Sequence, residues 1–117
     1  MSYVDGYVLP VPKKHVNTYR RMALIGRDAW LKHGAVDYKE CAGDDLVAKW
    51  GMPFTRMLKL KPGETVIFAF IVFKSRAHRD RVNARVMKEM EATGPSMKDM
   101  PFDPKRMVYG GFKTIVE

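Results

Sequence analysis

The fold of this chain is decided by ETVIFAFIVF, Glu64–Phe73, which runs directly into a basic stretch at residues 74–88. Successive side chains of a β-strand point to opposite faces. One face therefore carries Val66, Phe68, Phe70 and Val72, and the other carries Ile67, Ala69, Ile71 and Phe73. Both faces are apolar and both need cover. A helix covers one of them, so in a chain this short the other requires a second sheet, a second subunit or a ligand.

The length and composition indicate a single small domain spanning residues 1–117. A chain of 117 residues with 46% hydrophobic content supports one core. The N-terminus has no basic leader followed by an apolar run, so we expect no secretory signal and no membrane association. The only cysteine, Cys41, cannot form an intramolecular disulfide, which favours a cytoplasmic location.

The net charge of +8 raises the question of a nucleic-acid partner. The charge is spread along the chain, apart from the basic stretch that follows the strand. A lone basic helix is more often a solvated surface than a binding site, and we therefore expect no nucleic-acid partner. The prediction is that four side chains of this helix are exposed and bind nothing specifically: Arg76, Arg81, Arg85 and Lys88.

Helical and strand periodicities predict the order strand, helix, strand, strand, helix, strand. Besides the central strand we expect strands at 3–11, 35–42 and 106–116, helices at 13–33 and from 75 to about 91, and a short extended arm at 54–60. Gly34 is the expected stop of the first helix, Ser75 the expected cap of the second, and Gly94-Pro95 its stop. Gly110-Gly111 predicts a bulge or a close backbone approach in the last strand.

This order predicts an α+β domain with a ferredoxin-like βαββαβ arrangement, in which an antiparallel sheet carries both helices on one face. The bare face would then present Val66, Phe68, Phe70 and Val72. Packing that face against a second copy, as a homodimer, is the simplest way to bury it.

Three segments together resemble the YbaA-like family of small bacterial proteins of unknown function. They are YVDG at residues 3–6, ECAGDD at 40–45, and MKDMPFD at 97–103 running on to KRMVYGGF at 105–112. The resemblance covers almost the whole chain and implies a dimeric α/β-barrel fold, without an established activity or established catalytic residues. The wider superfamily includes cofactor-free monooxygenases, haem-degrading enzymes and stress proteins with a cavity between sheet and helices.

By analogy at the level of the fold, the main hypothesis is small-molecule binding in a cavity between sheet and helices, with no cofactor. A cofactor-independent or haem-linked monooxygenase is the first alternative. It requires Trp30, Tyr7 or Tyr109 in a pocket beside His78, which lies on the helix whose histidine binds iron in haem-degrading relatives.

An RNA-binding module is the second alternative, because the RNA-recognition motif has the same element order. Residues 68–73 fit the last six positions of its aromatic strand motif, but Val66 and Ile67 stand where a basic residue and glycine belong. We therefore rank RNA binding below dimer packing. The histidines lack metal-ligand spacing, and no metal site is predicted.

Arg79 breaks the pattern of the second helix. It shares an apolar stripe with Val82, Val86 and Met90, so a charge lies on the face that packs against the sheet. Such a charge needs a partner unless its head reaches water. The candidate partners are carboxylates: Asp5, Glu40 or the Asp44-Asp45 turn. The candidate ligand-binding residues are accordingly Arg79, Asp5, Glu40, Asp44, His78, Tyr7 and Tyr109.

Overall fold

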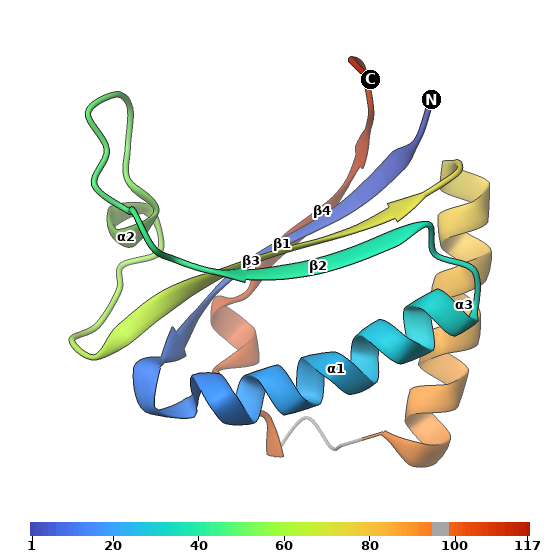
Figure 1. Cartoon of the computed structure of the whole chain (residues 1–117), viewed down its shortest axis with the longest axis horizontal. Coiled ribbons are helices and arrows are strands. Elements are labelled where there is room, and N and C mark those ends of the chain that lie inside the picture. The colour runs from blue at the N-terminus through green and yellow to red at the C-terminus, as the bar shows by residue number, and fades with distance from the viewer. Residues whose placement is uncertain (95–98) are drawn as a thin grey trace.

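A four-stranded antiparallel sheet forms the centre of the molecule, with two long helices on one of its faces (Figure 1). This computed structural model describes residues 1–94 and 99–117. The strands are β1 (Tyr3–Pro12), β2 (Asp37–Ala42), β3 (Glu64–Phe73) and β4 (Val108–Lys113). The helices are α1 (Val16–Lys32), α2 (Phe54–Met57) and α3 (Arg76–Thr93), with short 3-10 turns η1 (Lys13–His15) and η3 (Pro104–Arg106).

The strands lie in the order β2-β3-β1-β4, so β3 and β1 are central and β2 and β4 are the edges. All three neighbouring pairs are antiparallel. The predicted α+β class and the antiparallel sheet are confirmed. None of the described helices is long and apolar enough to cross a membrane.

The helix-covered face of β3 is the core of the protein. Ile67, Ala69, Ile71 and Phe73 are all at most 5% exposed. One cluster forms around Phe73 and includes Ile71, Ala29, Ala35, Val82 and Val86. A second cluster forms around Leu9 and includes Val11, Tyr19 and Ile67. Burial on this face is therefore shared between α1 and α3, as the two-faced pattern of the strand requires.

The opposite face of the sheet, which we call the bare face, is only partly covered. Val66 is 3% exposed, because residues 43–60 fold over that end of the sheet, whereas Phe68 remains 44% exposed. Phe70 and Val72 are half-buried, and Phe112 of β4 is 61% exposed. In Figure 1 the segment containing α2 lies on the side of the sheet away from α1. An apolar surface thus faces outward over the middle of the sheet.

The segment 54–60 differs from the expected extended arm. It begins with the single-turn helix α2, whose N-cap is Pro53, and the backbone N–H of Leu58 donates to the carbonyl of Phe54 at 2.9 Å. Pro53 fixes its own φ near the helical value and needs no N–H at this position, so it starts a turn readily. Four residues give too short a pattern for helical periodicity to show in the sequence.

The expected stops of both long helices hold, but α1 begins at Val16 and residues Lys13–His15 form the 3-10 turn η1 instead. Gly34 follows α1 with φ +113°, which a residue with a Cβ adopts only under strain. The Ser75 Oγ caps α3 by accepting from the backbone N–H of His78 at 3.1 Å. The helix ends at Thr93 before Gly94, and Pro95 lies outside the described residues. The four basic side chains predicted to face solvent on α3 are exposed.

Two strands begin later than expected. Val36 is 55% exposed and precedes β2, which starts at Asp37, and β4 starts at Val108. β4 pairs with β1 in continuous register, with Gly111 opposite Asp5, so the two glycines form no bulge. Gly111 marks a close approach instead: a Cβ there would lie 2.4 Å from the Tyr3 hydroxyl and 3.0 Å from Arg79 Nη1.

Candidate functional site: a pocket between α1 and the edge strand β2

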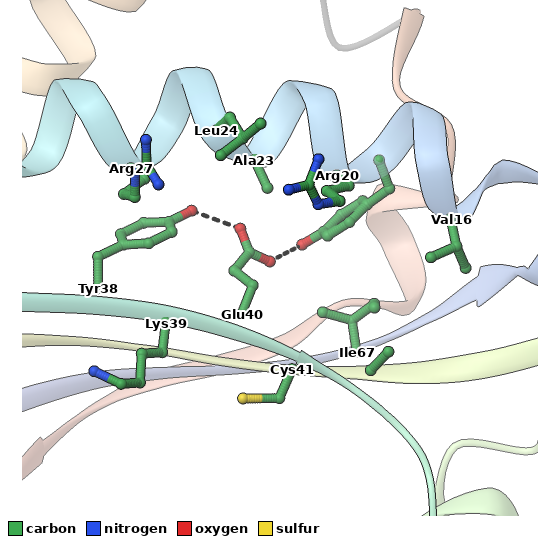
Figure 2. Close-up of a pocket in the computed structure, with 12 residues that line it drawn as sticks. Val16, Arg20, Ala23, Leu24, Arg27, Tyr38, Lys39, Glu40, Cys41 and Ile67 are labelled. Atoms are coloured by element: carbon green, nitrogen blue, oxygen red, sulfur yellow. Dashed lines mark hydrogen bonds between the residues drawn. The ribbon is translucent and has the colours of Figure 1, made fainter.

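A pocket of about 400 Å³ opens between α1 and the edge strand β2, on the helix-covered side of the sheet (Figure 2). This volume lies at the lower end of the range for small-molecule sites. Its apolar lining comprises Val16, Ala23, Leu24, Ala42 and Ile67. Its polar and charged lining comprises Tyr19, Arg20, Arg27, Tyr38, Lys39, Glu40 and Cys41.

Three of these residues form a hydrogen-bonded group that we call the Glu40 cluster: Glu40, Tyr19 and Tyr38. Glu40 and Tyr38 are two residues apart on β2, so both point to the helix-covered face. Tyr19 comes from the buried stripe of α1. The Tyr38 hydroxyl donates to Glu40 Oε2 at 2.6 Å, and the Tyr19 hydroxyl donates to Oε1. Figure 2 shows the Tyr38 hydroxyl pointing toward the Glu40 carboxylate. One carboxylate thus takes both phenolic hydrogens.

The electrostatics of this cluster keep both phenols neutral. Burial raises the pKa of Tyr19 far above its ordinary value, and the negative charge of Glu40 raises it further. The pKa of Tyr38 is raised for the same two reasons, in the same order. The phenols therefore remain hydrogen-bond donors to Glu40 throughout the physiological range.

Cations from α1 lie beside the cluster. Arg20 and Arg27 are seven residues apart on one helix face, with Ala23 and Leu24 between them. Arg27 is paired with Asp28 at 3.0 Å. Among the residues that the structure describes, Arg20 makes no ion pair and is exposed. Lys39 belongs to the bare face, opposite Phe70 in the β2–β3 register, and pairs with Asp37 at 2.7 Å.

A second polar cluster lies elsewhere on the helix-covered face and contains the predicted partner of Arg79. Arg79 Nη1 donates to Asp5 Oδ1 at 2.8 Å, and Asp5 is only 3% exposed. The other oxygen of Asp5, Oδ2, accepts from the side-chain nitrogen of Asn83 at 3.1 Å. The side-chain oxygen of Asn83 in turn accepts from Trp30 Nε1 at 2.9 Å. The Arg79–carboxylate contact is confirmed, with Asp5 rather than Glu40 or Asp44 as the partner.

Tyr7 and Tyr109 lie near the Arg79–Asp5 pair, and none of the candidates except Glu40 lines the pocket. Tyr7 and Tyr109 are stacked, with ring centroids 5.9 Å apart, and burial followed by the charge of Asp5 raises the pKa of Tyr7 to about 12. His78 Nδ1 accepts from the backbone N–H of Lys74 at 3.0 Å, and its ring meets Phe73 edge-on. Asp44 is exposed on its turn. Of the seven candidate ligand-binding residues, Glu40 alone lines the pocket.

Sequence reasoning missed Tyr19, Tyr38 and Arg20 as parts of one site. A signal was present: Glu40 shares the face of Tyr38 by the period of two, and Tyr19 lies on the apolar stripe of its helix. An acid on a core-facing strand position needs donors, and two phenols were available on the facing surfaces.

The fold and the pocket define a small α+β protein with an open, mixed-polarity pocket beside a sheet edge. The family described as "Protein of unknown function (DUF1428)" matches residues 2–104, and the chain belongs to that family. "Uncharacterized protein YbaA" of Escherichia coli (strain K12) is 36% identical over 121 residues, which cover 100% of this chain and 99% of the relative. The protein of the same description from Shigella flexneri is equally similar. The resemblance inferred from the three sequence segments is therefore confirmed.

Among solved structures, the de novo designed protein Foldit4 has a similar fold. The TM-score is 0.51 at 10% sequence identity, and the match covers 97% of this chain and 99% of that one. At this identity the similarity concerns the fold alone.

Proposed function

We propose that this protein binds a small molecule in the pocket between α1 and β2. The observation that carries the proposal is the Glu40 cluster: a core-facing carboxylate held by two phenols at the wall of an open pocket of about 400 Å³. Natural ligand sites combine apolar walls with a few convergent polar groups in this way. Leu24, Ala23 and Ile67 supply the apolar walls here.

The test is a pocket-filling substitution with a matched control on the same helix. Ligand-observed NMR with a mixture of small aromatic acids, alcohols and amines identifies any compound that the protein binds. Leu24→Trp places an indole in the pocket and should abolish binding. Leu31→Trp makes the same change at a 43% exposed position that does not line the pocket, and should not. Binding that survives Leu24→Trp, or that is absent from the unaltered protein, contradicts the proposal.

For the finer architecture, we propose a ferredoxin-like subunit in a dimeric α/β barrel. The strand order β2-β3-β1-β4 supports the ferredoxin-like assignment. The accessible surface of the chain is 8277 Å². A compact monomer of 13.4 kDa exposes roughly 6,500 Å². The excess of roughly 1,800 Å² is more than the approximately 800 Å² that each partner buries in an ordinary stable interface.

The proposed interface is the bare face, with Phe68, Phe70 and Val72 at its centre. Val66 is covered by the chain's own residues 43–60 and adds little. Phe112 and Val108 of β4, 61% and 54% exposed, extend the apolar surface. A cytoplasmic location is part of the same proposal and is supported by the single cysteine.

The two alternative functions, an oxygenase and an RNA-binding module, differ in the observations that favour them. The lining of the pocket includes neither His78 nor the aromatic residues Trp30, Tyr7 and Tyr109, so no observation favours an oxygenase. The exposure of Phe68 suits an RNA-stacking surface if the protein is monomeric. The oligomeric state therefore decides between RNA binding and dimer packing.

A further inference from the structure

The hydrogen-bond polarity of the pocket restricts the ligand that it can hold. Both phenolic hydrogens of the Glu40 cluster are used on Glu40 itself. The free sites that remain on these three side chains are oxygen lone pairs, which accept hydrogen bonds and cannot donate them. A ligand group placed here must therefore be a donor, such as a hydroxyl or an ammonium group.

Arg20 offers hydrogen-bond donors, whereas the Glu40 cluster offers only acceptors. A guanidinium group only donates, and it matches the planar geometry of a carboxylate. Arg27 adds a second positive charge on the same helix face, although Asp28 partly neutralises that charge in an ion pair. Arg20 is exposed and unpaired within residues 1–94 and 99–117, so its donors are free for an anion. The lining also includes Ala23, Leu24 and Ile67, which suit an apolar body.

We infer that the ligand of this pocket is a small carboxylic acid with an apolar body and a hydroxyl or ammonium donor. The donor is recognised by the oxygens of the Glu40 cluster, and the carboxylate by Arg20. This inference rests on the proposed function and adds the chemical class of the ligand. It also excludes simple hydrocarbons, which would leave the lone pairs of the Glu40 cluster desolvated and unmatched.

The probes for the test are four compounds that differ in one group each. They are 4-hydroxyphenylpropanoate, which has both groups; 3-phenylpropanoate, which lacks the donor; 4-methoxyphenylpropanoate, which has an acceptor in place of the donor; and 4-ethylphenol, which lacks the carboxylate. The affinity of each compound is measured by titrating it into the protein and monitoring the titration by NMR. A fifth compound, 4-(aminomethyl)phenylpropanoate, shows whether ammonium or hydroxyl is the preferred donor.

The expected order places one of the two donor-bearing acids first. Loss of the donor should weaken binding about tenfold or more, since a hydrogen bond to a charged acceptor contributes about 1.5–3 kcal/mol. The methoxy compound should bind no better than 3-phenylpropanoate. Equal binding by 3-phenylpropanoate and 4-hydroxyphenylpropanoate overturns the inference while leaving the proposed function intact. Binding of none of the compounds at millimolar concentration overturns it as well.

A matched pair of arginine variants tests whether Arg20 binds the carboxylate of the ligand. Arg20→Gln should lower the affinity for 4-hydroxyphenylpropanoate to that of 4-ethylphenol, and should leave 4-ethylphenol binding unchanged. Arg21→Gln changes the neighbouring exposed arginine, which does not line the pocket, and should have no effect on either compound. Equal losses in the two variants would show a diffuse charge effect and contradict the role of Arg20. Raising the salt concentration should weaken a diffuse effect much more than a direct pair.

Discussion

Replacing Phe68 by alanine removes the most central exposed ring of the bare face. Phe68 projects from β3, a central strand, and its ring centroid lies 6.0 Å from that of Phe70. If the bare faces of two copies pack together, this ring leaves water in both subunits. We therefore expect Phe68→Ala to weaken dimerisation strongly while leaving the helix-covered core unchanged.

The magnitude follows from the exposed area. Phe68 is 44% exposed. A phenylalanine side chain offers about 200 Å², so the dimer removes up to about 90 Å² of this ring from water, or about 2 kcal/mol per subunit. Two copies give about 4 kcal/mol, which is close to a thousandfold in the dimer dissociation constant. The entropic costs of association are the same for both proteins and cancel in this difference.

Sedimentation velocity over a range of protein concentrations measures the effect. The unaltered protein should be a dimer at micromolar concentration, and Phe68→Ala should be largely monomeric there. Ile25→Ala is the matched control, because Ile25 is 56% exposed on α1, away from the bare face, and should not alter the dimer. A monomeric unaltered protein, or a variant that dimerises as well as it does, would refute the reasoning. The first result would favour RNA stacking on Phe68, to be tested with single-stranded RNA.

Three further predictions concern stability, measured by denaturant unfolding. Arg79→Leu should lower the free energy of unfolding by about 3 kcal/mol, because it leaves the buried Asp5 carboxylate without its cation; a loss below 1 kcal/mol contradicts this. Arg106→Leu should lower the free energy of unfolding, because it breaks a two-bond pair with Glu64, at 2.6 and 2.9 Å; an unchanged midpoint contradicts it. Desolvation and neighbouring cations lower the pKa of His78 in the folded protein, so stability should fall as the pH drops below about 6.5, where the unfolded histidine takes up a proton. His78→Asn should reduce this dependence, and an identical pH profile in the variant would disprove the assignment.

Local periodicity was sufficient to predict the sheet and to limit the partner of Arg79 to three candidates. The two-faced pattern of β3 required helices on one side, and the register then places Asp5 of β1 on that same side. A cation on the inner stripe of α3 has few acids within reach, which is why Asp5 was among the three candidates. Both predictions depend on which face a side chain occupies, and that follows from spacing alone.

The pocket could not be predicted in the same way. Tyr19 and Glu40 are 21 residues apart in the chain, and they meet because α1 lies alongside the edge strand β2. The position of a helix along a sheet is set by side-chain packing over its whole length, which spacing does not specify. For the same reason the sequence offered Glu40 as a partner for Arg79, when two phenols already occupy both of its oxygens.

The edge strand β2 connects the two proposed surfaces. Glu40 lies opposite Ala69 and faces the pocket, whereas the next residue, Cys41, lies opposite Phe68 and faces outward. Because consecutive side chains alternate, substitutions at Glu40 and at Phe68 act on different faces and can be interpreted separately.

A movement of the β2 backbone is different, since it displaces both faces together. If a ligand holds β2 in one position, linkage requires that ligand binding and dimerisation strengthen or weaken each other by the same factor. The dimer dissociation constant of the unaltered protein, measured with and without 4-hydroxyphenylpropanoate, therefore reports whether the strand behaves as a rigid element or as a shared hinge.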